Sequence, residues 1–205
     1  MAVINIFVLL FAGYAYSIPL DDFKSAQTLT VDSLYQTRVN SVFNSGSLGG
    51  RRTLSLRLNA GIGVGAMVSP VTWPDVLSYQ ALLESAGTVK LNWDKSHNIT
   101  IKSNGLNGAN VKPNGEDRFR LRIVNFDYNY QKALHLRLRV YKNDSTNYFT
   151  YKEIILKRAY SNEIISIKFS DMSLGSAFDF ANIGALQLEL IDLGGNSLII
   201  DCFET

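Results

Sequence analysis

The stretch Asp117–Val124, DRFRLRIV, decides the fold because apolar and charged residues alternate along it without a break. Successive side chains of a β-strand point to opposite faces of the sheet, so this period of two predicts a strand and not a helix. The apolar residues are predicted to face a core and the arginines to form a row on the outer face. The inward residues are Phe119, Leu121 and Ile123, and the outward residues are Arg118, Arg120 and Arg122.

The same alternation recurs along most of the chain and predicts about ten or eleven short strands. Clusters of Asn, Gly, Pro and Asp separate these segments, and such residues favour tight turns. Many short strands with little helix indicate an all-β fold, namely an antiparallel β-sandwich of the jelly-roll kind. The clearest segments are 53–58, 88–93, 117–124, 134–141, 163–169 and 185–191.

One segment favours a helix. Pro74–Gly87, PDVLSYQALLESAG, has a proline at its start, helix-forming residues in its middle and a glycine at its end. The alternative is that Val76 and Leu77 open another strand.

The N-terminal residues predict export. Val3–Tyr16 is apolar apart from Asn5, and Ala15 and Ser17 supply the small residues of a cleavage site. We therefore expect a signal peptide over residues 1–17 and one β-sandwich domain over residues 18–205, secreted or at the cell surface. The alternative is a buried N-terminal strand. The apolar run of about 14 residues is shorter than the roughly 20 that a transmembrane helix needs.

Charge, cysteine and sequon content limit the partners. The formal net charge of the 205 residues is +2, which is too small to indicate nucleic acid. Cys202 is the only cysteine, so it is either a buried apolar residue or an intermolecular link. Asn98 and Asn143 begin N-glycosylation sequons.

The segment 134–141 supplies a second row of cations. The same parity predicts outward positions for His135, Arg137 and Arg139. If this strand pairs with the strand at 117–124, one sheet face carries at least five arginines. Nearby carboxylates such as Glu153 and Glu189 would relieve their repulsion, or the face would bind an anionic or hydroxyl-rich partner.

Aromatic residues in polar loops are candidate contact residues. Trp73 lies between prolines, and Tyr128 and Tyr130 lie in the loop after the arginine strand. Tyr148 and Tyr151 lie in the segment NYFTY. Each is a candidate for a sugar-binding surface or for a cap on the end of the sandwich. Trp93 continues an inward row and is predicted to be buried.

No motif indicates a reaction centre. The two histidines lack metal-ligand spacing, and neither a Gly-x-Ser-x-Gly elbow nor a recognisable acid pair is present. We therefore expect no catalysis and no cofactor. The alternative is a hydrolase or lyase whose carboxylates are far apart in the sequence and meet only in the fold. A structural Ca²⁺ is the one candidate metal, with Asp21, Asp22 and Asp201 as ligands near the two ends of the chain.

Three segments carry a resemblance to a known group. NSGSLGGRRTLSLRL (44–58), GLNGANVKPNGEDRFRLRI (105–123) and FDFANIGALQLEL (178–190) cover about a quarter of the chain. Together they resemble secreted bacterial β-sandwich proteins, many of which carry PEP-CTERM surface-sorting tails. The chain departs from that group because it ends at DCFET without such a tail. The resemblance implies export and a jelly-roll-like sandwich, and it implies no activity.

Two functions fit these observations. The first is a structural, assembly or adhesion role in an extracellular matrix, filament or cell surface, with other copies of the chain or a polysaccharide as partner. The second is a lectin-like carbohydrate-binding module.

Overall fold

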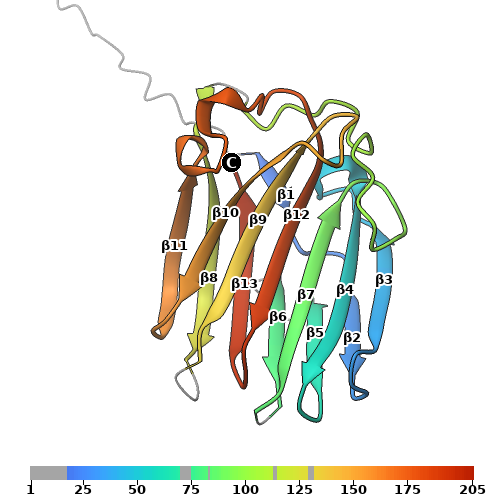
Figure 1. Ribbon diagram of the computed structural model, residues 1–205, viewed down its shortest axis with the longest axis vertical. Helices are drawn as coiled ribbons and strands as arrows, with labels where there is room; N and C mark the ends of the chain where they lie inside the picture. Colours follow the sequence, from blue (N-terminus) through green and yellow to red (C-terminus); the bar gives the residue numbers. More distant parts are fainter. Residues whose placement is uncertain (1–17, 70–74, 83, 113–114, 129–131) are drawn as a thin grey trace, which may run out of the picture.

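The structure, a computed structural model, describes residues 18–69, 75–82, 84–112, 115–128 and 132–205. Two antiparallel sheets pack face to face (Figure 1). Sheet A runs from β11 (Tyr160–Lys168) through β8 (Arg118–Asp127), β13 (Ser197–Glu204), β6 (Val76–Ala81) and β5 (Val64–Ser69) to β2 (Gln27–Val31), and β1 (Pro19–Asp21) pairs with β13. Sheet B runs from β10 (Phe149–Leu156) through β9 (Leu134–Lys142), β12 (Ile183–Asp192), β7 (Ala86–Trp93) and β4 (Arg51–Ala60) to β3 (Thr37–Phe43). The predicted β-sandwich is confirmed, with thirteen strands in the described residues where about ten were expected.

The inward rows form the core between the sheets, as the alternation predicted. Phe119, Leu121 and Ile123 of β8 are all fully buried, and the Phe119 ring lies 4.9 Å from that of Phe169. Trp93 is also fully buried, with its ring 5.3 Å from that of Phe203. Burying a large apolar side chain contributes about 1.5–3 kcal/mol, so these rows hold the two layers together.

The two arginine strands are not neighbours, so the condition for five arginines on one sheet face is not met. β8 pairs with β11 and β13 in sheet A, whereas β9 pairs with β10 and β12 in sheet B. The chain therefore crosses from one layer to the other between β8 and β9 (Figure 1). The two arginine rows lie on opposite outer faces of the sandwich, because each strand still turns its apolar side toward the shared core.

The predicted helix at Pro74–Gly87 is wrong. Within the described residues of this segment, the chain forms β6 and the start of β7. Leu77 and Tyr79 are buried with period two, and Glu84 has a positive φ of 56°, which a helix does not allow. Burial against the opposite sheet has overridden the helix propensity of the sequence.

The described residues also form short 3-10 turns. They are η1 (Leu48–Gly50), η3 (Phe169–Asp171) and η4 (Gly175–Ala177). The described residues contain no helix with the length and apolar composition of a membrane span.

Candidate functional site

The outer face of sheet B carries an ordered set of polar side chains, which we name the sheet B face. Strand register places the outward residues of β10, β9, β12, β7 and β4 side by side. They are Tyr151 and Glu153 from β10, Arg137 and Arg139 from β9, Gln187 and Glu189 from β12, Lys90 and Asn92 from β7, and Thr53 and Ser55 from β4.

One cross-strand row of this face is a chain of hydrogen bonds. Arg139 Nη1 donates to Gln187 Oε1 at 2.6 Å, and Gln187 Nε2 donates to Asn92 Oδ1 at 2.8 Å. Asn92 Nδ2 donates in turn to the carbonyl of Ile99 at 3.1 Å. Gln187 and Asn92 are buried although they point outward, so this row is fixed in place before any ligand arrives.

The second row is an ion-pair network around Glu189. Its carboxylate lies 3.1 Å from Lys90 Nζ, 3.3 Å from Arg137 Nη1 and 3.0 Å from Arg139 Nη1. Arg137 Nη2 lies 2.8 Å from Glu153 Oε1, and this hydrogen bond holds the pKa of Glu153 below its usual value. The expectation that Glu153 and Glu189 relieve the repulsion between cations is confirmed for this face.

A hollow of about 310 Å³ opens at the β10 side of the sheet B face. We call it the Tyr151 hollow, and its lining residues are Arg137, Arg139, Phe149, Tyr151 and Glu153. The Tyr151 side chain is 43% exposed, and its ring centroid lies 6.3 Å from that of Phe149. The hollow therefore combines an accessible aromatic ring with charged groups that are already hydrogen-bonded.

A second hollow of about 270 Å³ lies farther along the same face, beside β7 and β4. Ser55, Arg57, Thr88 and Lys90 line it, together with Glu189. Glu189 therefore lines the second hollow and also forms ion pairs with Arg137 and Arg139 of the Tyr151 hollow, so the two hollows share one carboxylate network.

The loop between β7 and β8 borders the face. The carbonyl of Ser96 accepts a hydrogen bond from Thr53 Oγ1 at 2.8 Å, which ties the loop to β4. Farther along, the Leu106 amide donates to the Gly184 carbonyl at 2.8 Å. A Cβ atom at Gly184 would overlap the carbonyl of Ser103, so glycine is needed for this approach of loop to strand.

The arginines of the opposite face are paired with local groups. Arg118 Nε lies 2.6 Å from Asp117 Oδ1, and Arg122 Nη1 lies 3.0 Å from Asp201 Oδ2. Arg120 Nη2 lies 3.4 Å from Glu116 Oε2. These arginines lie on β8 of sheet A, so the structure separates them from the hollows of the sheet B face.

Of the candidate aromatics Trp73, Tyr128 and Tyr130, only Tyr128 falls within the described residues, and the other two lie outside them. The ring of Tyr128 is half-buried and lies 6.3 Å from that of the core residue Phe126, as expected for a cap on the sandwich. Two residues of the sheet B face, Phe149 and Gln187, were not predicted from the sequence. The alternation of Phe149, Tyr151 and Glu153 along one strand indicated that these three side chains share a face.

The two sequons differ in exposure. Asn98 is exposed, whereas Asn143 is half-buried and its Oδ1 atom is buried without a hydrogen-bond partner. Glycosylation at either position stays a prediction.

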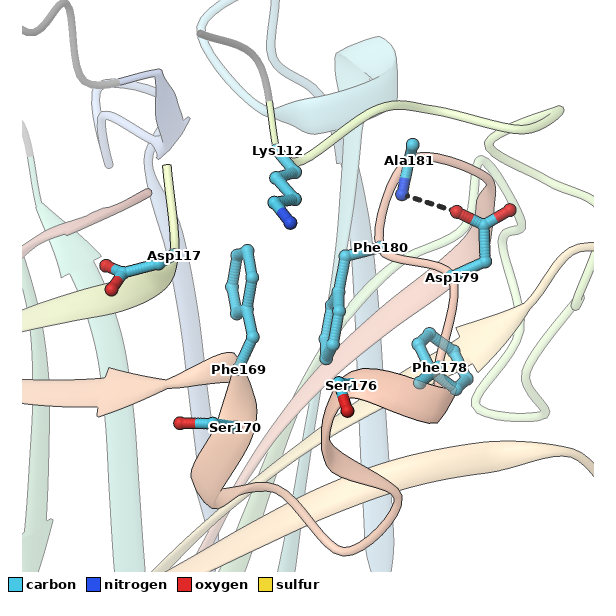
Figure 2. A pocket seen from close by; sticks show the side chains of 9 residues that line it. All are labelled: Lys112, Asp117, Phe169, Ser170, Ser176, Phe178, Asp179, Phe180 and Ala181. Atoms are coloured by element: carbon cyan, nitrogen blue, oxygen red, sulfur yellow. Dashed lines mark hydrogen bonds between the residues drawn. The ribbon is translucent and has the colours of Figure 1, made fainter. Parts of the chain in front are cut away.

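Another hollow, of about 400 Å³, lies at one end of the sandwich (Figure 2). The rings of Phe169 and Phe180 stack at 4.2 Å in its wall, and Lys112 reaches toward them. These two rings are only 6% and 4% exposed, and Asp117 is already bound by Arg118. The hollow therefore offers a ligand little aromatic surface.

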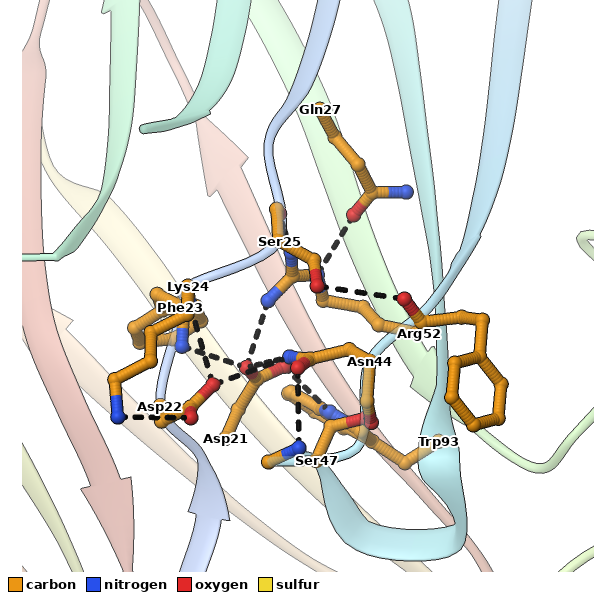
Figure 3. Close-up of polar contacts among 12 residues, drawn as sticks. Asp21, Asp22, Phe23, Lys24, Ser25, Gln27, Asn44, Ser47, Arg52 and Trp93 are labelled. Carbon is orange, nitrogen blue, oxygen red and sulfur yellow. Dashed lines mark hydrogen bonds and ion pairs between the residues drawn. The ribbon is translucent and has the colours of Figure 1, made fainter. Parts of the chain in front are cut away.

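Asp21, a predicted calcium ligand, belongs to a buried polar cluster between the sheets (Figure 3). Its Oδ1 accepts a hydrogen bond from Arg52 Nη1 at 2.7 Å, and its Oδ2 accepts one from Trp93 Nε1 at 2.8 Å. Burial raises the pKa of Asp21, and the charge of Arg52 opposes that shift. Both oxygens already serve to join the two layers.

The other two predicted calcium ligands also have partners. Asp22 Oδ2 lies 3.4 Å from Lys24 Nζ, and Asp201 pairs with Arg122. The described ranges contain no set of three or more His, Cys, Asp or Glu side chains placed to hold a metal ion. Calcium binding stays a prediction.

Cys202 is half-buried on the outer side of β13. Burial, followed by a hydrogen bond with Asp201, raises the pKa of its thiol to about 11. Cys202 is therefore less buried than the apolar core residue that was one alternative, and the intermolecular link stays a prediction.

No family model and no curated protein matches the chain. Among solved structures, the chain is similar to a family 11 carbohydrate-binding module from Clostridium thermocellum in complex with a β-1,3-1,4-mixed-linked tetrasaccharide. That similarity has 13% identity and a TM-score of 0.42, over 92% of this chain and 94% of that one. A second similarity is to TmCBM61 in complex with β-1,4-galactotriose, with 11% identity, a TM-score of 0.33 and 90% of each chain covered. Similarity at this level does not establish a shared function.

Proposed function

We propose that this protein binds carbohydrate on the sheet B face and acts as a lectin-like module outside the cell. The observation that carries the proposal is the Tyr151 hollow, where an exposed aromatic ring lies beside hydrogen-bonding side chains that are already ordered.

Sugars present two kinds of surface, and the hollow has a partner for each. The C–H groups on one face of a sugar ring pack against an aromatic ring, whose face carries partial negative charge. The hydroxyl groups around the sugar need donors and acceptors with fixed geometry, because an unpaired polar group is costly when buried. Tyr151 supplies the ring, and Arg137, Arg139 and Glu153 supply donors and acceptors around it.

The size and the rigidity of the hollow suit a small segment of glycan. Small-molecule sites occupy about 300–1,000 Å³, and this hollow lies at the lower end of that range. The arginines are held by Gln187, Glu189 and Glu153, so a ligand would not need to order long flexible side chains. Ordering such side chains on binding costs about 0.5–1.5 kcal/mol each, so preorganisation favours affinity.

Glycan retention tests this function directly. Purified protein is run through native gels containing dissolved polysaccharides, and retardation is compared for wild type, Tyr151→Ala and Ile164→Ala. Tyr151→Ala removes the ring and is expected to abolish most retention, because stacking surface is lost while the strand remains. Ile164 is 64% exposed on β11 of sheet A, so Ile164→Ala is the matched surface control and should behave as wild type.

Absence of retention on every glycan, or equal retention by both variants, would contradict the proposal. The structural or assembly role stays a second prediction. A concentration series in size-exclusion chromatography, with and without reductant, tests it on the same preparation.

A further inference from the structure

We infer, on the basis of the proposed function, that the glycan held in the Tyr151 hollow is uncharged. The alternation of arginines in the sequence suggests an acidic polysaccharide, but the structure shows these cations already engaged by carboxylates of the same face.

Arg137 has little capacity left for an anion. Its Nη2 contacts Glu153 Oε1 at 2.8 Å and its Nη1 contacts Glu189 Oε2 at 3.3 Å. A sulfate or carboxylate ligand normally binds a guanidinium through two parallel N–H groups. To do so here, it would have to displace one carboxylate and would leave that carboxylate close to a second negative charge.

Arg139 is held through its Nη1 atom. Its Nη1 lies 2.6 Å from Gln187 Oε1 and 3.0 Å from Glu189 Oε2. The Glu189 side chain is only 7% exposed and depends on its three cations for compensation. Drawing Arg139 toward an anionic ligand would weaken the pairing of a buried carboxylate, which is costly because water cannot replace the lost partner.

The ion-pair network that borders the hollow is one positive charge from balance. Lys90, Arg137 and Arg139 face two carboxylates, Glu153 and Glu189. Glu153 lines the hollow with about a third of its side chain exposed, so it repels an approaching anion and can accept hydrogen bonds from hydroxyl groups. The lowered pKa of Glu153 means that this carboxylate is ionised at neutral pH. Neutral hydroxyl groups therefore match the hollow better than acidic groups do.

A comparison of uncharged and acidic polysaccharides tests the inference. The full chain is run in affinity gels with β-glucan and galactomannan as uncharged probes, and with alginate and polygalacturonate as acidic probes. Retention on an uncharged probe should change less than about twofold between about 0.01 M and about 1 M salt, over which the Debye length falls from about 30 Å to about 3 Å. Retention on the acidic probes should be absent.

Glu153→Gln supplies a gain-of-function arm. It removes the carboxylate from Arg137 without changing side-chain size, so it should create clear retention on alginate at low salt, where the wild type shows none. Glu163→Gln is the matched control, because Glu163 of β11 pairs with the exposed Arg158 and its replacement changes the net charge equally. The control should show no gain on alginate.

The outcomes separate the two proposals. Retention on uncharged probes with an alginate gain only in Glu153→Gln supports the inference. Salt-sensitive retention of the wild type on alginate, or an equal gain in both variants, overturns the inference and leaves carbohydrate binding standing. Failure of the wild type to be retained on any probe overturns the proposed function itself.

Discussion

Replacing Arg52 by methionine is expected to destabilise the protein strongly. The Arg52 side chain is fully buried between the sheets, and its guanidinium donates to Gln27 Oε1 at 2.6 Å, Asp21 Oδ1 at 2.7 Å and the Ser25 carbonyl at 2.5 Å. Arg52→Met keeps the apolar stem but leaves Asp21 buried without its counter-ion. Breaking a buried pair in this way costs about 3–5 kcal/mol.

The expected loss is large on the temperature scale. For a domain of this size, 1 kcal/mol corresponds to a shift in Tm of about 2–4 °C, so a loss of about 4 kcal/mol predicts a fall of about 8–16 °C. The penalty should be smaller in acid. Burial already raises the pKa of Asp21, and without Arg52 the folded state would bind the proton more tightly still. A group whose pKa is raised in the folded state stabilises that state at low pH, and this effect is lost as pH rises through the folded pKa. Arg52→Met should therefore lose more stability at pH 7, where buried Asp21 would be charged, than below the unfolded pKa of Asp21.

Equilibrium denaturation with urea, followed by tryptophan fluorescence, measures this effect. Trp93 donates to the other oxygen of Asp21 and lies in the same cluster, so its environment changes when the cluster opens. Arg57→Met on the same strand is the control: Arg57 is exposed, and a surface substitution should change the free energy of unfolding by about 0.5 kcal/mol or less. A free energy of unfolding for Arg52→Met within about 1 kcal/mol of the wild type would refute the assignment of Arg52 as the link between the layers.

Two further predictions concern titrating groups. Because the hydrogen bond from Arg137 lowers the pKa of Glu153, the ion pair should stabilise the wild type above the unfolded pKa of a glutamate and lose that effect as pH falls. The difference in the free energy of unfolding between wild type and Glu153→Gln should therefore shrink between about pH 7 and about pH 3, and a constant difference in urea titrations would contradict this. The thiol of Cys202, with its pKa raised to about 11, should react with a disulfide reagent roughly ten to a hundred times more slowly in the native protein than in urea. Equal rates in the two states would show that burial does not protect the thiol.

The sequence by itself determined which side of each strand faces the core. Phe119, Leu121 and Ile123 had to be buried together, since side-chain alternation is a local property of the extended backbone. The same parity even placed Arg52 inward, on the side of Leu54 and Leu56, although that signal was missed. The prediction of export and the resemblance to PEP-CTERM proteins also come from the sequence alone.

Only the tertiary structure decided which strands are neighbours and therefore where a site forms. Arg118 and Arg137 have the same local pattern, yet they lie on opposite faces of the sandwich because β8 and β9 belong to different sheets. The Tyr151 hollow needs side chains from β10 and β9, and its arginines are held by β12, about fifty residues farther along the chain. Pairing between such distant segments depends on how well the assembled layers pack and on which loop closures the chain can make, and periodicity within one segment carries no information about either.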